Sequence, residues 1–305
     1  MTIRIAIVGY GKIACDQHLP AISADPRFIL AAVCTPSGDP GLGVPWFTGI
    51  DDLLDGMSGK IDAIVVCTPP AVRHDIASKA LEAGLGVMLE KPPTATLGEI
   101  DDLTRIATAR NLPFFASWHA QHAAAIPAAA DALRDAEIAG VQIRWCEDVR
   151  KWHPGQEWIW EPRGFGVFDP GINGLSIATR ILPITLFVTE ARLLFPANKQ
   201  APIAAALTFA GEGRCASMDW RPCELEVYDV RVETADGRTV HILSGGDRLE
   251  INGKDCAVNS FSCYSSIYDR FAAVVSERQV DVDREPLRIV VDSFLIGQRD
   301  LIEPF

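Results

Sequence analysis

Two stretches in the first third of the chain carry residue types that could bind or react with a small molecule. The first, residues 9–14 (GYGKIA), follows the aliphatic run Ile3–Val8 and has the pattern G-x-G-x-x-A. Between a buried strand and a helix, the first glycine of this pattern permits a tight turn and the second lets the backbone approach a pyrophosphate. The helix amino terminus attracts the phosphate charge. The pattern predicts a dinucleotide site, with candidate residues Gly9, Gly11, Lys12 and Ile13.

The second stretch is Val87–Pro93 (VMLEKPP), in which strand-like residues lead to Lys91 and two prolines. Pro92 lacks a backbone donor and biases Lys91 towards extended geometry, so the strand should end there. Open α/β sheets bind their ligands at the carboxyl ends of the strands. Lys91 is therefore a candidate for ligand binding or catalysis, and the alternative is an ordinary surface lysine.

Two further strand ends add candidates. Phe28–Cys34 predicts the second strand, and its tip offers Cys34 and Thr35 but lacks the acidic residue that commonly holds an NAD ribose. NADP is therefore permitted, and the choice between NAD and NADP stays open. Ile61–Cys67 predicts another buried strand, which ends in Thr68-Pro69-Pro70 and is followed by His74. His74 is either a structural helix cap or a functional group.

The elements that position these residues alternate between strand and helix. A helix is expected from about Arg73 to Ala83 with a cap at Gly84, and Pro20 should kink the first helix. Thr96 and Glu99 form a capping-box pattern at the start of the next helix, which should run to about Arg110. Pro113–Ser117 closes the alternation, which predicts a doubly wound parallel sheet.

After His119 the alternation ends and strands follow one another. The expected strands are Gln142–Cys146, Thr189–Phe195, Ala201–Phe209, Cys215–Trp220, Glu226–Thr234 and Arg238–Leu243. Asp236-Gly237 is a hairpin signal between the last two. Gly171–Arg180 and Tyr264–Glu277 are the helices expected to cover one face of this sheet. A final helix, about Arg284–Asp300, is expected to pack back against the body of the protein.

Three motifs together resemble the Gfo/Idh/MocA family of NAD(P)-dependent oxidoreductases: GYGKIA, CTPP with His74, and EKPP at Lys91. The stretch Lys151–Asn173 resembles the sugar 1-dehydrogenases of that family, which act on D-galactose or L-arabinose. The resemblance implies a Rossmann domain at residues 1–120 and, at residues 121–305, an α/β domain with a large open, mostly antiparallel sheet. It also implies a homodimer or homotetramer formed through the open sheet face. The implied cofactor contacts add Cys34, Thr35, Thr68, Pro69, His74, Glu90 and Lys91.

The resemblance also implies the chemistry, in which an aldopyranose is oxidised at C1 by hydride transfer to nicotinamide. The family lysine and aspartate match Lys91 and Asp169, whereas Asn173 stands where the family has a histidine. An amide does not transfer protons, so Asn173 is expected only to hold the reacting hydroxyl. Either Asp169 is the base and Lys91 stabilises the oxyanion, or Lys91 is the base with a lowered pKa. We favour Asp169 because a carboxylate is already deprotonated at pH 7.

The residues before Asp169 suit a polyol. Four of the seven tryptophans lie between Trp145 and Trp160, close to acidic residues. Sugars offer hydroxyl edges to carboxylates and apolar faces to aromatic rings, although tryptophans of this kind are also common at the edge of a core. Together with Asp169 and Asn173, the expected substrate contacts are Glu147, Trp152, His119 and His153. D-galactose, L-arabinose and D-fucose are the expected substrates, with D-glucose poor.

Composition narrows the remaining possibilities. The formal charge of −12 argues against nucleic acid or an anionic membrane as partner, and no apolar run has the length of a membrane span. Eight cysteines without zinc spacing favour free thiols, a cytoplasmic location and no metal site. The alternatives are another dehydrogenase of the family, of the inositol or dihydrodiol type, and a non-enzymatic regulator that binds a dinucleotide. A metal-dependent hydrolase is not favoured, because the sequence contains no cluster of metal ligands.

Overall fold

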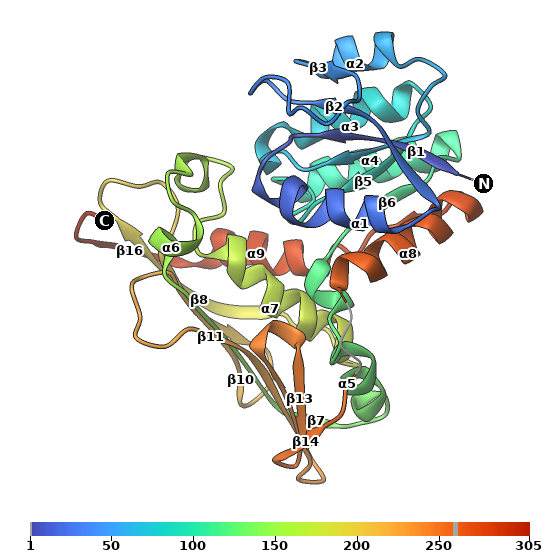
Figure 1. The fold of residues 1–305 in the computed structure, drawn as a ribbon. Coiled ribbons are helices and arrows are strands. Elements are labelled where there is room, and N and C mark those ends of the chain that lie inside the picture. Colours follow the sequence, from blue (N-terminus) through green and yellow to red (C-terminus); the bar gives the residue numbers. More distant parts are fainter. Residues whose placement is uncertain (1, 259–261) are drawn as a thin grey trace. The chain divides into compact units, whose positions relative to one another are not determined.

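The computed structural model describes residues 2–258 and 262–305 (Figure 1). The chain forms two compact units. Unit 1 consists of Met1–Trp118 and Tyr264–Asp283, and unit 2 consists of His119–Cys263 and Arg284–Phe305. The first chain crossing thus lies between Trp118 and His119, where the alternation of strands and helices ends in the sequence.

Unit 1 is built on a parallel sheet of seven strands in the order β15-β6-β5-β4-β1-β2-β3. The central strands are aliphatic and nearly fully buried, as expected for a sheet with helices on both faces. The strands are β1 (Ile3–Val8), β2 (Phe28–Cys34), β3 (Trp46–Phe47), β4 (Ala63–Val66), β5 (Gly86–Leu89), β6 (Phe114–Ala116) and β15 (Val280–Asp281). The predicted parallel Rossmann-type sheet is confirmed.

The helices of unit 1 follow local signals in the sequence. Residues 12–24 are helical throughout, with a π-helical segment η1 (Ala14–His18) directly before α1 (Leu19–Ala24). Pro20, at which a kink was predicted, lies in the first turn of α1. Thr96 Oγ1 accepts the Glu99 amide at 3.2 Å and caps α4. Gly84 has φ +84° just after α3. The helices are α2 (Ile50–Gly56), α3 (Pro70–Glu82), α4 (Leu97–Arg110) and α8 (Cys263–Glu277).

Unit 2 contains a mixed, mostly antiparallel sheet of nine strands in the order β14-β13-β12-β11-β7-β10-β9-β8-β16. The expected strands are all present with small shifts in their ends, and Gly237 (φ +84°) forms the predicted turn between β11 and β12. The strands are β7 (Ile138–Cys146), β8 (Val188–Pro196), β9 (Ala204–Phe209), β10 (Arg214–Asp219), β11 (Val227–Thr234), β12 (Thr239–Leu243), β13 (Arg248–Ile251), β14 (Lys254–Cys256) and β16 (Gln298–Ile302).

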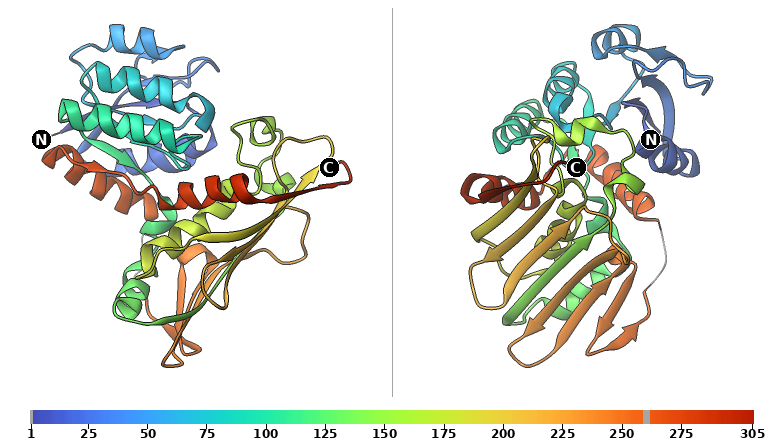
Figure 2. Two further views of the ribbon diagram at one scale, coloured as in Figure 1. Left: turned by 180° about the vertical axis from the view of Figure 1, so that it is seen from behind. Right: turned by 90° about the vertical axis from the view of Figure 1, so that its left-hand side faces the viewer.

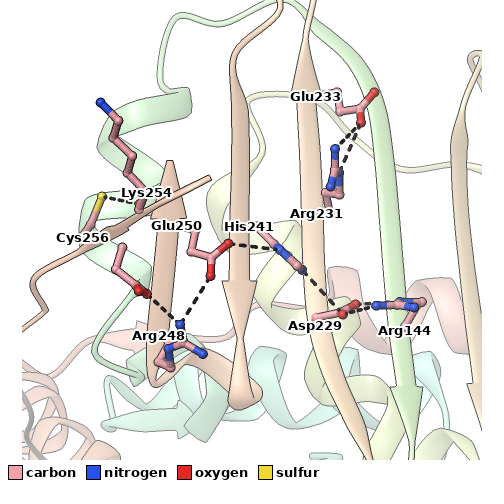
Figure 3. Close-up of polar contacts among 10 residues, drawn as sticks. Arg144, Asp229, Arg231, Glu233, His241, Arg248, Glu250, Lys254 and Cys256 are labelled. Atoms are coloured by element: carbon pink, nitrogen blue, oxygen red, sulfur yellow. Dashed lines mark hydrogen bonds and ion pairs between the residues drawn. The ribbon is translucent and has the colours of Figure 1, made fainter. Parts of the chain in front are cut away.

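The two faces of this sheet differ. Helices α5 (Ile126–Leu133), α7 (Phe168–Ile181) and α9 (Glu285–Ile296) lie along one face (Figures 1 and 2). The other, called the open face below, carries polar side chains in cross-strand contact (Figure 3). Asp229 of β11 accepts two hydrogen bonds from Arg144 of β7 and lies 3.5 Å from His241 Nε2 of β12. The short helices of unit 2 are η2 (His119–His122), α6 (Val149–Trp152), η3 (Glu157–Trp160) and η4 (Ser244–Gly246).

Two expectations about the carboxyl-terminal helices are wrong: the sheet that one of them covers, and the residue at which the other ends. Helix α8 does not cover the second sheet: it packs in unit 1, where Phe271 stacks against Phe28 and Phe115 at 6.3 Å. Helix periodicity shows that one side is buried but not against which sheet. The last helix ends at Ile296 and belongs to unit 2, and the residues after Gly297 form β16 beside β8. A Cβ at position 297 would lie 2.4 Å from Ser293 O, so glycine permits this close exit from the helix.

Candidate active site

The glycine loop of unit 1 has the shape that a pyrophosphate requires. Gly9 has φ +91°, and a Cβ there would lie 2.7 Å from the Thr68 backbone nitrogen, so no larger residue fits. A Cβ at Gly11 would meet nothing within 4 Å, which leaves open space beside the start of the helix at residue 12. Thr68 Oγ1 is buried and finds no hydrogen-bond partner within the described part of the chain. These features fit a dinucleotide, whose phosphates would occupy the open space.

The tip of β2 is neutral. The Cys34 thiol is buried, and burial, followed by the nearby Asp52 carboxylate, raises its pKa to about 11. Thr35 is also buried, and its carbonyl accepts the Trp46 indole N–H at 3.0 Å. The carboxylate of Asp39, beyond the turn, accepts the Gly41 amide at 2.9 Å. The tip therefore presents a thiol and a hydroxyl where NAD enzymes commonly have a carboxylate.

His74 lies between two helices. Its Nε2 is 3.0 Å from Asp102 Oδ2, which joins α3 to α4. Both residues line a hollow of about 470 Å³ together with Ser78, Arg105 and Arg110. Pro69 precedes α3 as its N-cap residue, and the exposed Lys12 pairs with Asp16 one turn along its helix. The imidazole of His74 thus has a structural partner on α4.

The segment around Lys91 is held from two sides. The peptide bond between Lys91 and Pro92 is cis. The buried guanidinium of Arg73 donates to the carbonyls of Thr68, Glu90 and Pro92. On the other side the Glu90 carboxylate accepts the Lys91 amide at 2.9 Å. Arg73, next to His74 in the sequence, was not among the predicted site residues. The one sequence feature that could have indicated it is its position after the CTPP motif.

The Glu90 side chain belongs to a buried polar network that links three distant segments of unit 1. Its Oε1 accepts the Tyr264 hydroxyl at 2.7 Å and lies 3.1 Å from His18 Nε2. His18 Nδ1 in turn lies 3.0 Å from the Tyr268 hydroxyl. Burial lowers the pKa of His18, but the nearby Cys67 and Glu90 outweigh it and raise this pKa to about 10. Through the bond of Glu90 to the Lys91 amide, this network holds the backbone that carries Lys91.

In unit 2 a hollow of about 270 Å³ brings together three of the expected substrate contacts. Its lining consists of His119, Ala120, Trp145, Glu147, Trp152, Tyr228 and Gly245. Trp145 and Tyr228 face each other across β7 and β11 with ring centres 5.2 Å apart. The buried Trp145 Nε1 makes no hydrogen bond to any residue that the structure describes. Trp145 and Tyr228 were not predicted, although the alternation of buried residues along their strands could have indicated that both point to the covered face.

Carboxylates lie close to this hollow. Glu147 is buried, and its Oε1 accepts the Trp220 indole N–H at 3.1 Å. Burial first, and then the Glu147 and Glu226 carboxylates, raise the pKa of Tyr228, so its phenol stays protonated. Trp152 is 43% exposed, and its indole N–H donates to Glu226 at 2.9 Å. The arrangement offers hydrogen-bond acceptors beside aromatic rings, which is the combination that a sugar requires.

Asp169 and Asn173 lie one turn apart at the start of α7 and so share a helix face. The helix N-cap is Val167, so Asp169 lies inside the first turn of the helix. Helix α7 can approach the sheet closely because of its glycines: a Cβ at Gly171 would lie 2.3 Å from Met218 Sδ. This contact fixes the depth of Asp169, which is 4% exposed.

His153 lies between two acidic groups. Its Nε2 is 3.8 Å from Asp169 Oδ2 and 3.9 Å from Glu147 Oε1. Asp169, His153 and Glu147 thus form one cluster in unit 2. Lys91 belongs to unit 1, so its action together with Asp169 stays a prediction. A cluster of His, Cys, Asp or Glu able to hold a metal does not occur in residues 2–258 or 262–305.

Comparison with known proteins identifies the family. Residues 3–117 match the Gfo/Idh/MocA oxidoreductase family with its NAD-binding Rossmann fold. Over 308 aligned residues the chain is 44% identical to galactose 1-dehydrogenase of Pseudomonas fluorescens, covering 99% of this chain and 98% of that one. The chain belongs to the Gfo/Idh/MocA family of oxidoreductases.

Solved structures agree with this assignment. A D-galactose-1-dehydrogenase protein from Rhizobium etli is 45% identical, with a TM-score of 0.93 over 100% of this chain and 98% of that chain. A 3-ketoreductase from Actinomadura kijaniata, solved with NADP and TDP-benzene, shares the fold with a TM-score of 0.84 at 16% identity, covering 99% of this chain and 100% of that chain. The predicted family and fold class are confirmed for this Gfo/Idh/MocA oxidoreductase. Within the described residues no helix is long and apolar enough to cross a membrane.

Proposed function

We propose that this oxidoreductase removes a hydride from C1 of an aldopyranose and passes it to NAD or NADP, giving the aldonolactone. Its similarity to galactose 1-dehydrogenase over nearly the whole of both chains carries the proposal. The hollow of unit 2 supports it, because Glu147 and the rings of Trp145 and Trp152 suit a sugar. D-galactose, L-arabinose and D-fucose are the proposed substrates.

In this proposal residues of unit 1 bind the cofactor, and residues of both units act on the C1 hydroxyl. Bound nicotinamide supplies the hydride acceptor. Asp169 takes the proton of the C1 hydroxyl, and Asn173, one turn along α7, holds that hydroxyl by hydrogen bonding. Lys91 stabilises the negative charge that develops on the oxygen. The glycine loop of Gly9 and Gly11 holds the pyrophosphate and so orients the cofactor.

The experiment is a kinetic matrix of sugars against NAD and NADP. D-galactose, L-arabinose and D-fucose should give kcat/KM values within about two orders of magnitude of one another, because one small substituent changes binding by about 1–3 kcal/mol. D-glucose should be poor because its C4 hydroxyl is inverted. The highest kcat/KM with D-glucose would overturn the sugar assignment. Activity only with inositols or dihydrodiols would favour the alternative dehydrogenases, and cofactor binding without any turnover would favour a regulator.

We also propose a homodimer or homotetramer that pairs the open faces of two copies in the cytoplasm. The open face carries charges of both signs, including Arg144, Asp229 and Arg231, so that two copies related by a two-fold axis can offer complementary charges. The eight cysteines, all within the described residues, form no disulfide, which suits a reducing compartment. Sedimentation at micromolar concentration should give a dimer or tetramer, and a monomer would contradict the proposal.

A further inference from the structure

The proposed reaction leaves one proton on Asp169 in every turnover. Asp169 is 4% exposed, so water has little direct access to its carboxyl group. The proton must reach solvent before the next substrate can react, and a neighbouring group that can both accept and donate a proton would provide the route. The inference below rests on the proposed role of Asp169 as base.

His153 has the geometry of such a group. Its Nδ1 lies 3.2 Å from Gln156 Oε1, and an amide oxygen only accepts hydrogen bonds. The neutral ring therefore carries its proton on Nδ1, which leaves the Nε2 lone pair on the side of Asp169 Oδ2 and Glu147 Oε1. Because both of these neighbours are carboxylates, a proton that arrives at Nε2 produces an imidazolium next to negative charge.

His153 also lines a second hollow in unit 2, of about 310 Å³. In the described residues this hollow shares no lining residue with the one that holds Trp145 and Trp152. Its other walls include the exposed residues Arg150, Gly155 and Glu157, so solvent reaches it. The charged groups around His153 are Asp169 and Glu147 on its Nε2 side, and Arg150, Glu157 and Lys199 around the hollow.

We propose that His153 carries the proton from Asp169 to solvent through this second hollow. The hydride leaves C1 with both electrons, and the hydroxyl proton moves to Asp169. Asp169 then passes it to His153 Nε2. The imidazolium turns towards the second hollow and releases this Nε2 proton to water or buffer, so the ring ends neutral with its proton on Nδ1 as before. At 3.8 Å the two atoms are beyond hydrogen-bond distance, so transfer requires the ring to move closer or one water to bridge.

The test is chemical rescue of His153→Gln by imidazole. In dilute buffer at saturating substrate, kcat should fall about tenfold or more while the KM for the substrate changes little. Added imidazole should restore kcat of the variant in a saturable way and leave the native enzyme unchanged. His119→Gln is the matched comparison, because His119 lines the other hollow and its loss should raise KM without rescue. A fluorescence titration with the cofactor confirms that each variant is folded.

Two results would overturn the proposal. One is an unchanged kcat in His153→Gln, and the other is a raised KM that imidazole does not correct, which would make His153 a substrate contact only. The assay uses whichever CH–OH substrate the native enzyme oxidises fastest. If that substrate is not an aldose, the sugar assignment fails while rescue of His153→Gln still supports the proton route.

Discussion

At the scale of single residues, Asp169, His153 and Glu147 bring two carboxyl groups and an imidazole together in unit 2. The resemblance implies a histidine where this chain has Asn173, and an amide does not transfer protons. His153 stands beside Asp169 from another segment, 3.8 Å away. A histidine from outside α7 is thus a candidate for the proton transfer that Asn173 cannot perform.

Asp169→Asn should abolish turnover. If Asp169 is the base, kcat falls at least about 100-fold, because an amide cannot accept the hydroxyl proton. Cofactor affinity should stay within about twofold, since the glycine loop lies in unit 1. Steady-state kinetics and a fluorescence titration with the cofactor measure both quantities, and near-normal turnover would move the role of base to Lys91.

Trp145→Phe tests whether the buried indole N–H donates a hydrogen bond to the substrate. Because Trp145 Nε1 has no hydrogen-bond partner in the described part of the chain, the bound sugar is its natural acceptor. Loss of one such bond costs about 0.5–1.5 kcal/mol, so the KM for the sugar should rise about 2–10-fold with a small change in kcat. An unchanged KM in a variant with native melting temperature would exclude this contact.

At the scale of elements, close packing at glycines positions the reacting groups. Gly171 brings α7 against Met218 of β10, and Gly9 brings the first loop against the backbone of Thr68. A side chain at either glycine would push apart the two elements that are in contact there, and so move the residues of the candidate site. The two glycines of the fingerprint nevertheless have different roles, because Gly9 is confined by the protein and Gly11 faces open space.

Gly9→Ala and Gly11→Ala should separate folding from cofactor binding. Alanine at position 9 meets Thr68 and has an unfavourable positive φ, so the free energy of unfolding should fall by about 1–3 kcal/mol and cofactor binding should weaken as well. Alanine at position 11 should leave stability within about 0.5 kcal/mol but weaken cofactor binding, because the new methyl enters the space of the pyrophosphate. Urea unfolding and cofactor titration distinguish these results. Equal loss of stability in both variants would contradict the assignment.

At the scale of the whole molecule, each unit is assembled from two separated parts of the chain. Unit 1 gains Tyr264 and Tyr268 from the carboxyl-terminal third, and both join the network of His18 and Glu90 beneath Lys91. The support of the expected catalytic lysine therefore depends on residues that lie more than 170 positions away in the sequence.

The same network should make stability depend on pH. The folded-state pKa of His18, about 10, is above its ordinary value of 6.5, so the folded protein holds this proton more tightly than the unfolded chain. The stabilisation is complete below about pH 6.5 and is lost as the pH rises towards 10. Within that window this site lowers the free energy of unfolding by up to about 1.4 kcal/mol per pH unit.

His18→Gln isolates this contribution. The variant should be less stable than the native protein at pH 6.5, and the difference between the two should shrink as the pH approaches 10. Urea unfolding at several pH values measures the two stability curves. Parallel curves across the window would show that His18 is not charged in the folded protein.

The sequence by itself determined the family, the parallel sheet and most strands, because aliphatic runs, glycine turns and caps are encoded by neighbouring residues. It also placed Gly9, Lys91 and Asp169 at the ends of elements. The strands β3, β13, β14, β15 and β16 were missed, since each is short and takes its partner from the surrounding sheet.

Only the tertiary structure decided which distant residues meet. Helix α8 packs in unit 1 through ring contacts with distant residues. Arg73 donates hydrogen bonds to the carbonyls of Glu90 and Pro92, and His153 lies near Asp169. Each of these contacts joins segments that are far apart in the sequence. Local sequence patterns report that a face is apolar or that a strand ends, but they carry no information about which surface is buried against it. For this protein the sequence showed which residue types could bind a cofactor or transfer a proton. Long-range packing determined which side chains contact those residues, shift their pKa values and fix their positions.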